Sequence, residues 1–353
     1  MSGRKVVLGL LVAAIVAAGA AATAVWWLLG APAAESQPRE VEILPGWGAS
    51  RVAAELRELG LIRNARLFSL YLRWQEVDRQ LGEGLYDLDP AFTAAETARV
   101  LAGPGRPRIT RVVIPEGFRA RDIAARLTEA GFGEAADYTE LAGTAGPGLR
   151  EWLPDADVPD GYAEALLPLE GFLFPASYDI PVRSSPQQVV GMFLDRFEQE
   201  LNLPGVQERL AELGLSVRDW VILASLVQSE AGSTAEMPVI AGVFLNRLDI
   251  GMPLQSDPTV AYGLGKALPE LSVSAGDMQA DHPWNTYVYP ELPAGPISNP
   301  GHDALQAVLQ PERTNEAGQQ WFYFLHGTDA GEPVFRPNPD YDSHLRDIAR
   351  YLR

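Results

Sequence analysis

The chain has 353 residues, a formal net charge of −18 at pH 7 and no cysteine. This length leaves room for two or three compact units with a substantial core. The acidic balance, without clustered Lys or Arg, argues against a nucleic-acid partner. The absence of Cys excludes disulfides, thiolate metal sites, a Cys nucleophile and lipid attachment to an N-terminal Cys.

The N-terminal residues have the pattern of a membrane-spanning helix. Arg4 and Lys5 precede an uncharged apolar run over residues 6–30, and Trp26 and Trp27 lie near its end. At about 1.5 Å per residue, this run crosses a hydrocarbon core of about 30 Å with some tilt. The two positive charges predict that the short tail before the run lies in the cytoplasm and that the remaining chain lies outside.

A cleaved signal peptide is the alternative to an uncleaved anchor. The Ala-rich segment at 31–34 suits a cleavage site, but the apolar run is longer than the core of about 7–15 residues that signal peptides have. We therefore favour the anchor. The linker that follows, residues 31–40, spans at most roughly 35 Å when extended. It is expected to hold the folded part close to the outer face of the membrane.

A strand, a Pro/Gly/aromatic turn and a helix ended by Gly occur twice, at residues 41–60 and 112–131. This recurrence indicates a duplicated unit, although two copies do not make a solenoid. Between the copies we predict a helix at 67–74, a strand at 84–88 and a helix at 93–101. The Gly/Pro cluster at 103–107 is the predicted domain boundary.

The segment 169–178 is rich in aromatic residues. We favour a buried strand and turn for it, and the alternative is a wall of a saccharide cleft, where aromatic faces stack on sugar rings. Helices are predicted next at 187–201 and 206–213. Segments 133–160 read as loop or short helix and indicate no function.

The most apolar part of the chain is predicted to form a buried helix. Ser216 and Asp219 have the spacing of a capping box, and residues 220–227 are almost wholly apolar. Glu230 follows at helical spacing on the same apolar stripe. Desolvation raises the pKa of such a carboxyl group, which can then donate a proton near neutral pH. The alternative is a Glu230 beyond the last turn that forms a structural ion pair with Arg247.

Two turn-dense segments, residues 251–260 and 284–301, carry amides, hydroxyls and aromatic side chains. Loops of this kind on a rigid scaffold often contact ligands, although Pro-rich loops also simply cross a surface. The C-terminal residues predict a strand at 321–325, its partner at 333–335 and a helix at 341–352.

The remaining chemistry points to one carboxylic acid. The four His residues form no H-x-x-x-H pair, and the chain has no Walker loop, dinucleotide fingerprint or Gly-x-Ser-x-Gly elbow, so no metal and no cofactor is expected. Ser225 and Ser229 lack a neighbouring base, which makes a serine nucleophile improbable. Glu230 remains the best single catalyst. Ordinary glycoside hydrolysis also requires a second carboxylate, and Asp257 or Glu236 is the candidate.

Five motifs carry a resemblance to a known family. They are LEGFLFPASY (169–178), LASLVQSEAG (223–232), VIAGVFLNRL (239–248), LQSDPTVAYG (254–263) and NTYVYPELPAGPISNPG (285–301). On these motifs the chain, from about Val41 to its C-terminus, resembles the endolytic murein transglycosylases of the MltG/YceG-like family, membrane-anchored enzymes that cut peptidoglycan glycan strands. The resemblance implies that Glu230 is the catalytic acid. Many members have Glu where this chain has Gln228, so that position is not the essential acid. Ala176 likewise replaces an Asp that is common in the family.

The family chemistry implies a reaction that needs only one carboxylic acid. Glu230 is expected to protonate the oxygen between N-acetylmuramic acid and N-acetylglucosamine, and then to accept a proton from the muramyl C6 hydroxyl, which closes a 1,6-anhydro ring. No water and no second protein carboxylate is required, because the nucleophile belongs to the substrate. Five residues are candidates for holding acetamido and hydroxyl groups, with a purely structural role in their loops as the alternative. They are Gln255, Ser256, Asp257, Asn285 and Tyr287.

The expected fold is α+β. Its parts are a cytoplasmic tail (1–5), a transmembrane helix (6–30), a linker (31–40), a LysM-like subdomain (41–105) and the endolytic transglycosylase catalytic domain (106–353). The expected location is the cell membrane, with a single pass and an extracytoplasmic catalytic domain. The tether motivates action on nascent glycan strands beside cell-wall synthesis proteins. Two alternatives stay open, a water-using muramidase and a non-catalytic, membrane-anchored wall-binding protein.

Overall fold

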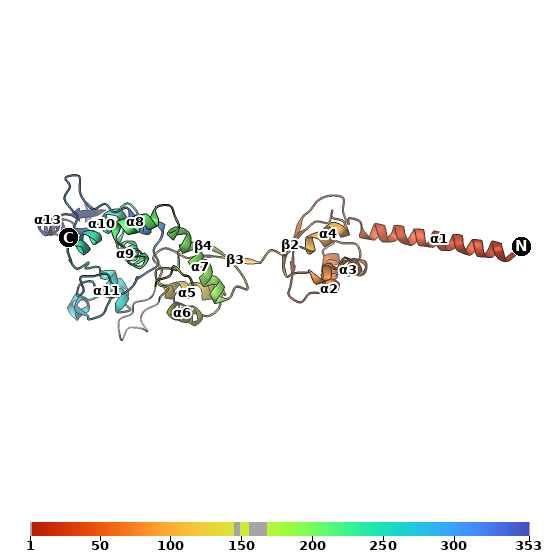
Figure 1. The fold of residues 1–353 in the computed structure, drawn as a ribbon, viewed down its shortest axis with the longest axis horizontal. Coiled ribbons are helices and arrows are strands. Elements are labelled where there is room, and N and C mark those ends of the chain that lie inside the picture. The colour runs from red at the N-terminus through yellow and green to blue at the C-terminus, as the bar shows by residue number, and fades with distance from the viewer. Residues whose placement is uncertain (1, 145–148, 155–167, 353) are drawn as a thin grey trace. The chain divides into compact units, whose positions relative to one another are not determined.

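The computed structural model describes residues 2–144, 149–154 and 168–352, and the chain divides into two compact units, residues 1–109 and 110–353 (Figure 1). In the described residues the strands pair into three separate two-stranded sheets. Helices and short two-stranded sheets are thus segregated instead of alternating within one parallel sheet. The predicted α+β class is confirmed at this level.

The first unit consists of an apolar helix followed by a small globular part. Its elements are α1 (Ser2–Leu29), β1 (Arg39–Ile43), α2 (Ala49–Glu58), α3 (Ala65–Trp74), a 3-10 turn (Val77–Arg79), β2 (Gly84–Leu88) and α4 (Ala94–Leu101). β1 and β2 pair antiparallel, with Val41 opposite Tyr86. One face of this sheet packs with the apolar faces of the helices, and Leu56, Phe68 and Leu88 lie fully buried in the shared core.

Helix α1 contains the predicted span. Residues Val7–Leu29 are long and apolar enough to cross a membrane, and none of this stretch is buried against protein. The end of α1 nevertheless contacts the globular part of its unit. The guanidinium of Arg63 donates to the Trp27 carbonyl at 2.6 Å and lies 4.3 Å from the centroid of the Trp27 ring.

The segment predicted as a linker is bonded to the turn that follows β2. The Ala33 amide donates to the Pro90 carbonyl at 2.9 Å. The Gln37 amide donates to Asp89 Oδ1 at 3.1 Å, and the Ser36 hydroxyl donates to the other oxygen of Asp89. Residues 33–37 therefore follow a fixed path along the first unit instead of forming an extended spacer.

The recurring strand, turn and helix is present in both units. β1 and α2 form the first copy, and β3 (Ile109–Val113) and α5 (Ala120–Glu129) form the second. Gly46 and Gly117 hold the two turns at φ 76° and 75°, and the helices end at left-handed Gly60 and Gly131. These positions require glycine because a Cβ disfavours positive φ. The predicted repetition is confirmed.

The second unit is mainly helical. Besides β3 and α5 its elements are α6 (Ala135–Thr144), β4 (Ser177–Pro181), α7 (Pro186–Leu201), α8 (Val206–Leu213), α9 (Val217–Glu230), α10 (Met237–Asp249), α11 (Asp257–Gly263), three 3-10 turns (Leu268–Glu270, Val273–Ala275 and Asp277–Gln279), α12 (His302–Leu309), β5 (Tyr323–Asp329), β6 (Glu332–Asn338) and α13 (Tyr341–Tyr351). β3 pairs with β4, and β5 pairs antiparallel with β6, with Leu325 opposite Arg336. The predicted C-terminal strand pair and helix are confirmed.

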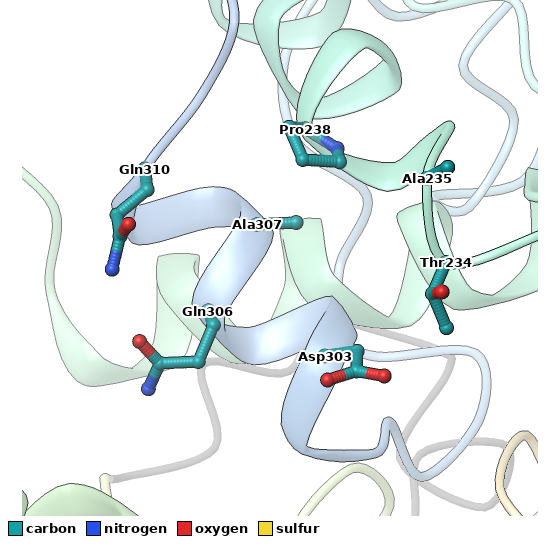
Figure 2. Close-up of a pocket in the computed structure, with 7 residues that line it drawn as sticks. All are labelled: Thr234, Ala235, Pro238, Asp303, Gln306, Ala307 and Gln310. Carbon is teal, nitrogen blue, oxygen red and sulfur yellow. The ribbon is translucent and has the colours of Figure 1, made fainter.

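Helix α9 lies at the centre of this unit. Residues Trp220 to Val227 are all buried, and the indole N–H of Trp220 donates to the Leu305 carbonyl at 2.8 Å. α9 packs against both α10 and α12, which also contact each other. The start of α10 and one side of α12 border a surface hollow of about 360 Å³ (Figure 2). The buried helix predicted for this stretch is confirmed, with a break after Glu230 before α10 begins.

The aromatic segment before β4 belongs to the core. Leu169, Phe172 and Phe174 are buried, and the Tyr178 hydroxyl donates to the Phe174 carbonyl at 2.5 Å. Phe172 packs edge-on against Phe197 of α7. The interpretation of this segment as a buried strand and turn is confirmed, and its interpretation as a saccharide-stacking wall is wrong, because these aromatic faces are covered by other side chains.

Candidate active site

Glu230 is the last residue of α9, where the buried helix reaches the surface of the unit. Its side chain is half-buried: part of it stays accessible, while the surrounding protein removes much of the water around the carboxyl group. This desolvation raises the pKa of Glu230 to about 6, and the negative charge of Asp257 acts in the same direction. A carboxylic acid with this pKa is partly protonated near neutral pH and still reachable by a ligand.

Ser256 contacts Glu230 directly. Its hydroxyl donates to Oε1 of Glu230 at 2.6 Å, a charge-assisted bond that lowers the pKa of Glu230 against the larger effect of burial. Ser256 itself is 1% exposed, and its amide donates to the Thr286 hydroxyl at 3.0 Å. Ser256, one of the five predicted candidates, therefore contacts the proposed acid and positions one of its carboxyl oxygens.

Gln255 has a left-handed backbone, with φ 54°. This conformation costs energy for a residue with a side chain and is often found at functional sites. It directs the Gln255 amide to the Thr286 carbonyl at 3.0 Å and turns the next residue, Ser256, toward Glu230. The Gln255 side chain is exposed. The strained turn is thus what brings the 254–257 loop onto the end of α9.

Asp257 and Tyr287 form a second contact at the same site. The Tyr287 hydroxyl donates to Oδ1 of Asp257 at 2.5 Å. Burial raises the pKa of Tyr287, with additional contributions from Asp257 and Glu230, so the phenol stays protonated as a donor. Asp257 is exposed and Tyr287 half-buried. The two loops thus place a carboxylate and a phenol beside Glu230.

Asn285 is fully buried and faces its own loop. Its amide nitrogen donates to the carbonyls of Met278 and Ala280, at 3.1 Å and 2.7 Å, and its amide oxygen accepts from the Tyr287 amide at 2.9 Å. All of the donor capacity of this side chain is used by backbone groups. The contacts favour the structural alternative for Asn285, which sets the conformation of the loop that carries Tyr287.

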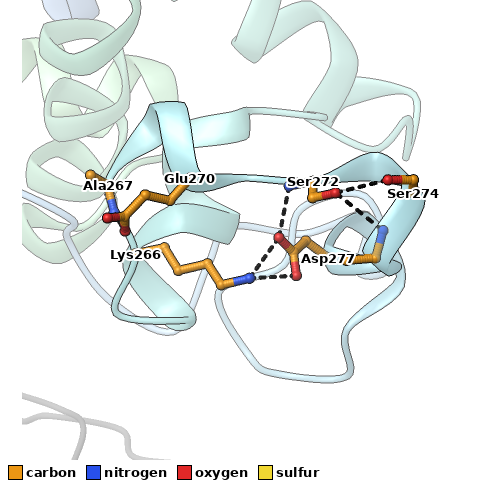
Figure 3. Close-up of polar contacts among 7 residues, drawn as sticks. Lys266, Ala267, Glu270, Ser272, Ser274 and Asp277 are labelled. Atoms are coloured by element: carbon orange, nitrogen blue, oxygen red, sulfur yellow. Dashed lines mark hydrogen bonds and ion pairs between the residues drawn. The ribbon is translucent and has the colours of Figure 1, made fainter.

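An ion pair stabilises the loop between α11 and Asn285. Lys266 Nζ lies 2.7 Å from each carboxyl oxygen of Asp277, and the Ser272 amide donates to the same carboxylate at 2.8 Å (Figure 3). The bonds from Lys266 and Ser272 hold the pKa of Asp277 below its usual range. Three 3-10 turns are therefore fixed in place directly before the buried amide of Asn285.

The structural ion pair considered for Glu230 does not form. Arg247 is 6% exposed and donates to the carbonyls of Phe322, Pro253 and Leu254. Its guanidinium also lies 5.2 Å from the centroid of Tyr323. Across the described ranges, no ion pair within 4.0 Å joins Glu230 to a basic side chain. Arg247 instead fixes the 253–254 backbone that leads into Ser256.

Three other polar residues of α9 have structural partners. The Ser225 hydroxyl donates to the Ile222 carbonyl at 2.7 Å, and the Ser229 hydroxyl donates to the Ser225 carbonyl at 2.8 Å. Both hydroxyls are thus directed along their own helix, which is unsuited to a nucleophile. The Gln228 amide oxygen accepts from the Gly301 amide at 3.0 Å and joins α9 to the start of α12.

Glu236 differs from Glu230 although both lie near the end of α9. It accepts from the Gly232 amide at 2.8 Å and lies 2.9 Å from Nε2 of His326. Burial alone would raise its pKa, but these hydrogen bonds outweigh burial and lower the pKa. Glu236 therefore stays ionised and holds the loop that follows Glu230, which leaves Asp257, whose charge acts on the Glu230 pKa, as the remaining candidate for a second carboxylate.

The sequence interpretation missed Glu170, a buried carboxyl group within the aromatic segment. It is 2% exposed and accepts from the Ala120 amide at 2.9 Å, the Asn299 amide at 2.9 Å and the Tyr262 hydroxyl at 3.2 Å. Burial raises its pKa to about 7. Since Tyr262 belongs to α11, Glu170 fixes the helix that carries Asp257 at its first turn. A carboxylate in the middle of an apolar run, LEGFLF, was the available signal.

The fold and this site together define a class of protein. A half-buried carboxylic acid with a raised pKa, held by a hydroxyl and close to a second carboxyl group, is the arrangement of a general acid–base site. Within the described residues, no group of three or more His, Cys, Asp or Glu side chains is arranged to hold a metal ion.

The chain belongs to the YceG-like family, whose defining pattern matches residues 41–350. A Streptococcus pneumoniae protein named endolytic murein transglycosylase is 27% identical over 334 residues, which cover 88% of this chain and 58% of that protein. A Bacillus subtilis protein of the same name is 28% identical over 300 residues, covering 84% and 80%. The chain therefore spans less than two thirds of the length of the pneumococcal relative.

A crystal structure of a YceG-like protein from Listeria monocytogenes has the same fold. It is 27% identical, and the superposition covers 88% of this chain and 99% of that chain with a TM-score of 0.56. The resemblance inferred from the five motifs is thus confirmed at the level of the family.

Proposed function

We propose that this chain is a membrane-anchored endolytic lytic transglycosylase of peptidoglycan in which Glu230 acts as acid and then as base. The observation that carries the proposal is the half-buried Glu230 carboxyl group, with a pKa of about 6, inside the LASLVQSEAG motif of a YceG-like chain. Relatives over most of this chain are named endolytic murein transglycosylases.

In this mechanism protonated Glu230 donates its proton to the glycosidic oxygen between N-acetylmuramic acid and N-acetylglucosamine. The resulting carboxylate then takes the proton of the muramyl C6 hydroxyl, whose oxygen attacks C1 and forms the 1,6-anhydro end. The acid is regenerated, so the proton balance closes within one residue. The Ser256 hydroxyl stabilises the carboxylate between the two steps, because it donates to Oε1 at 2.6 Å.

The exposed groups around Glu230 are the proposed glycan contacts. The Gln255 side chain, Asp257 and Tyr287 remain accessible and offer an amide, a carboxylate and a phenol to acetamido and hydroxyl groups. Ser256 is proposed to act on Glu230, and Asn285 to position the loop, since both are buried with their polar atoms engaged. This divides the five predicted residues into three that touch substrate and two that position the site.

We propose that the first unit holds the enzyme at the membrane. Residues Val7–Leu29 would cross the membrane once with the N-terminus in the cytoplasm, residues 41–105 would form a LysM-like subdomain, and residues 106–353 would form the catalytic domain. This arrangement favours action on nascent strands near the synthesis proteins. Deleting residues 1–30 tests it in cells: normal glycan length with the soluble form would contradict a need for tethering.

The decisive experiment compares the products of wild-type and Glu230→Gln protein on purified peptidoglycan by mass spectrometry. We expect 1,6-anhydro ends from the wild type and a loss of rate by a factor of about 100 to 10,000 in the variant. Glu291→Gln is the matched control, since Glu291 is exposed and carries the same change. Full cleavage by Glu230→Gln would eliminate the proposed acid. An intact wild-type protein without any cleavage would favour the non-catalytic wall-binding alternative.

One observation keeps the muramidase as a second candidate. Asp257 follows Ser256, which contacts Glu230, and its charge contributes to the raised pKa of Glu230. A carboxylate on this loop has the chemical type that activates water in hydrolysis. The same mass spectra decide between the two, because hydrolysis leaves reducing ends instead of anhydro ends.

A further inference from the structure

The hollow beside α12 has the composition of a carbohydrate site that the proposed mechanism does not use. Its lining comes from α12 and the residue after it, from the loop between α9 and α10, and from the start of α10 (Figure 2). The lining residues are Thr234, Ala235, Pro238, Asp303, Gln306, Ala307 and Gln310. Its volume of about 360 Å³ lies at the lower end of the range of roughly 300–1,000 Å³ for small-molecule sites, and suits one sugar ring better than a folded peptide.

Four lining side chains are polar and uncommitted. Thr234, Asp303, Gln306 and Gln310 make no hydrogen bond or ion pair through their side chains anywhere in the described part of the chain. A hydroxyl, a carboxylate and two amides match the hydroxyl and acetamido groups of an N-acetylated sugar. Asp303 and Gln306 lie one helical turn apart on α12, next to the small side chain of Ala307, and Gln310 is the residue that follows the helix.

Both walls of the hollow are fixed before any ligand arrives. Ala304, Leu305 and Val308 of α12 are fully buried, and the Leu305 carbonyl accepts from Trp220 of α9. On the opposite side, Glu236 holds the loop through the Gly232 amide and His326. Because these walls are already rigid, little conformational entropy is lost when a ligand binds. This favours the binding of a ligand that makes only weak polar contacts.

The hollow begins close to the proposed catalytic residue. Thr234 follows Glu230 by four residues, a backbone reach of at most about 14 Å. At the other wall, the Gly301 amide at the start of α12 is bonded to Gln228, two residues before Glu230. A polymer that is cut at Glu230 away from its ends extends beyond the cut on both sides, and the hollow lies within a few sugar lengths of Glu230.

We propose that the hollow binds one N-acetylglucosamine unit of the glycan strand at a distance from the cut, and this inference rests on the function proposed above. Asp303 selects the sugar. Its carboxylate repels the lactyl carboxylate of N-acetylmuramic acid but accepts hydrogen bonds from the hydroxyls of N-acetylglucosamine. Gln306 and Gln310 supply the amides that recognise the acetamido group.

Binding of a tetramer of N-acetylglucosamine to the full chain in detergent tests the site directly by calorimetry. This probe lacks N-acetylmuramic acid and gives a result that needs no catalysis. Gln306→Ala combined with Gln310→Ala is expected to weaken its binding about tenfold, the equivalent of two neutral hydrogen bonds. Gln199→Ala, on an exposed face of α7, is the matched control and should bind as the wild type does.

Kinetics on long and short strands give the second measurement. The double variant should show a KM about tenfold higher for long strands, with kcat unchanged and with no change for a substrate too short to reach the hollow. Asp303→Asn should bind muramic-acid oligomers more tightly than the wild type does. Equal tetramer binding by the wild type and the double variant, or an equal rise of KM on both substrates, would overturn the proposal. If the proposed function were wrong, the wild type would cleave no glycan. The calorimetric measurement does not require cleavage, so the two failures can be told apart.

Discussion

Replacing Ser256 by Ala should change the pH at which this protein works. The Ser256 hydroxyl donates to Glu230 at 2.6 Å and stabilises the ionised carboxylate, so its removal must raise the pKa of Glu230 above its present value of about 6. A hydrogen bond to a charged group contributes about 1.5–3 kcal/mol. Since one pKa unit corresponds to about 1.4 kcal/mol, the expected rise is about 1–2 units.

The sign of the effect on activity follows from the proposed role of Glu230 as an acid. Only the protonated form can start the reaction, so kcat/KM of the wild type should fall as the pH rises through about 6. In Ser256→Ala this decline should move to about pH 7–8. The variant should therefore exceed the wild type in relative activity on the alkaline side, even though the second step, which uses the carboxylate as a base, loses a hydrogen bond.

The assay is the rate of formation of anhydro ends from glycan strands between pH 4 and 9. Ser229→Ala is the matched control, because Ser229 precedes Glu230 but its hydroxyl donates to the Ser225 carbonyl. The control should keep the wild-type profile. An unchanged alkaline limb in Ser256→Ala would refute the reasoning, and so would a shift to lower pH.

Three further outcomes are expected. Asp257→Asn removes the negative charge that raises the pKa of Glu230, so the alkaline limb of the rate profile should move to lower pH by less than about one unit, opposite to Ser256→Ala. Burial holds the pKa of Glu170 at about 7 against an ordinary value of 4.5, so its contribution to the unfolding free energy is fully present below pH 4.5 and is lost as the pH rises through 7. Glu170→Gln should remove this loss of about 3 kcal/mol, which denaturant titrations over a pH series would detect, and an unchanged pH dependence would contradict it. Asn285→Ala leaves backbone groups without partners and should lower the unfolding free energy by about 3 kcal/mol while the rate profile keeps its pH midpoint; a midpoint shift would indicate contact with the reacting groups instead.

Local signals predicted many elements of this fold well. The strand Gly84–Leu88 lies at its predicted residues, and the capping box at Ser216 begins α9 as its spacing predicts. Glu230 was located by its position on an apolar stripe, which survives in the structure as the end of a buried helix. Such features depend on residues within one or two turns of each other.

Other features depend on contacts between distant residues, and the sequence interpretation did not reach them. Helix α11 begins with Asp257 and Pro258, whereas the Pro-containing pattern of residues 251–260 predicts a loop, although Pro also suits the first turn of a helix. The direction of Arg247 toward three backbone carbonyls depends on the fold of the 322 and 253 segments. The burial of Glu170 depends on Asn299, which lies more than a hundred residues away. No local pattern contains this information.

The bonds of the segment after α1 also determine how far the first unit can move. Ala33, Ser36 and Gln37 are bonded to the turn at Asp89 and Pro90, and Arg63 holds the last turn of the helix. The distance between α1 and the globular part of the first unit is therefore fixed by the bonds to Asp89 and Arg63. It does not depend on the number of residues in the segment. Residues inserted before Ser36 would form a bulge without lengthening the unit. Loss of the Asp89 carboxylate would instead free Ser36 and Gln37 from the turn, and the segment could then extend.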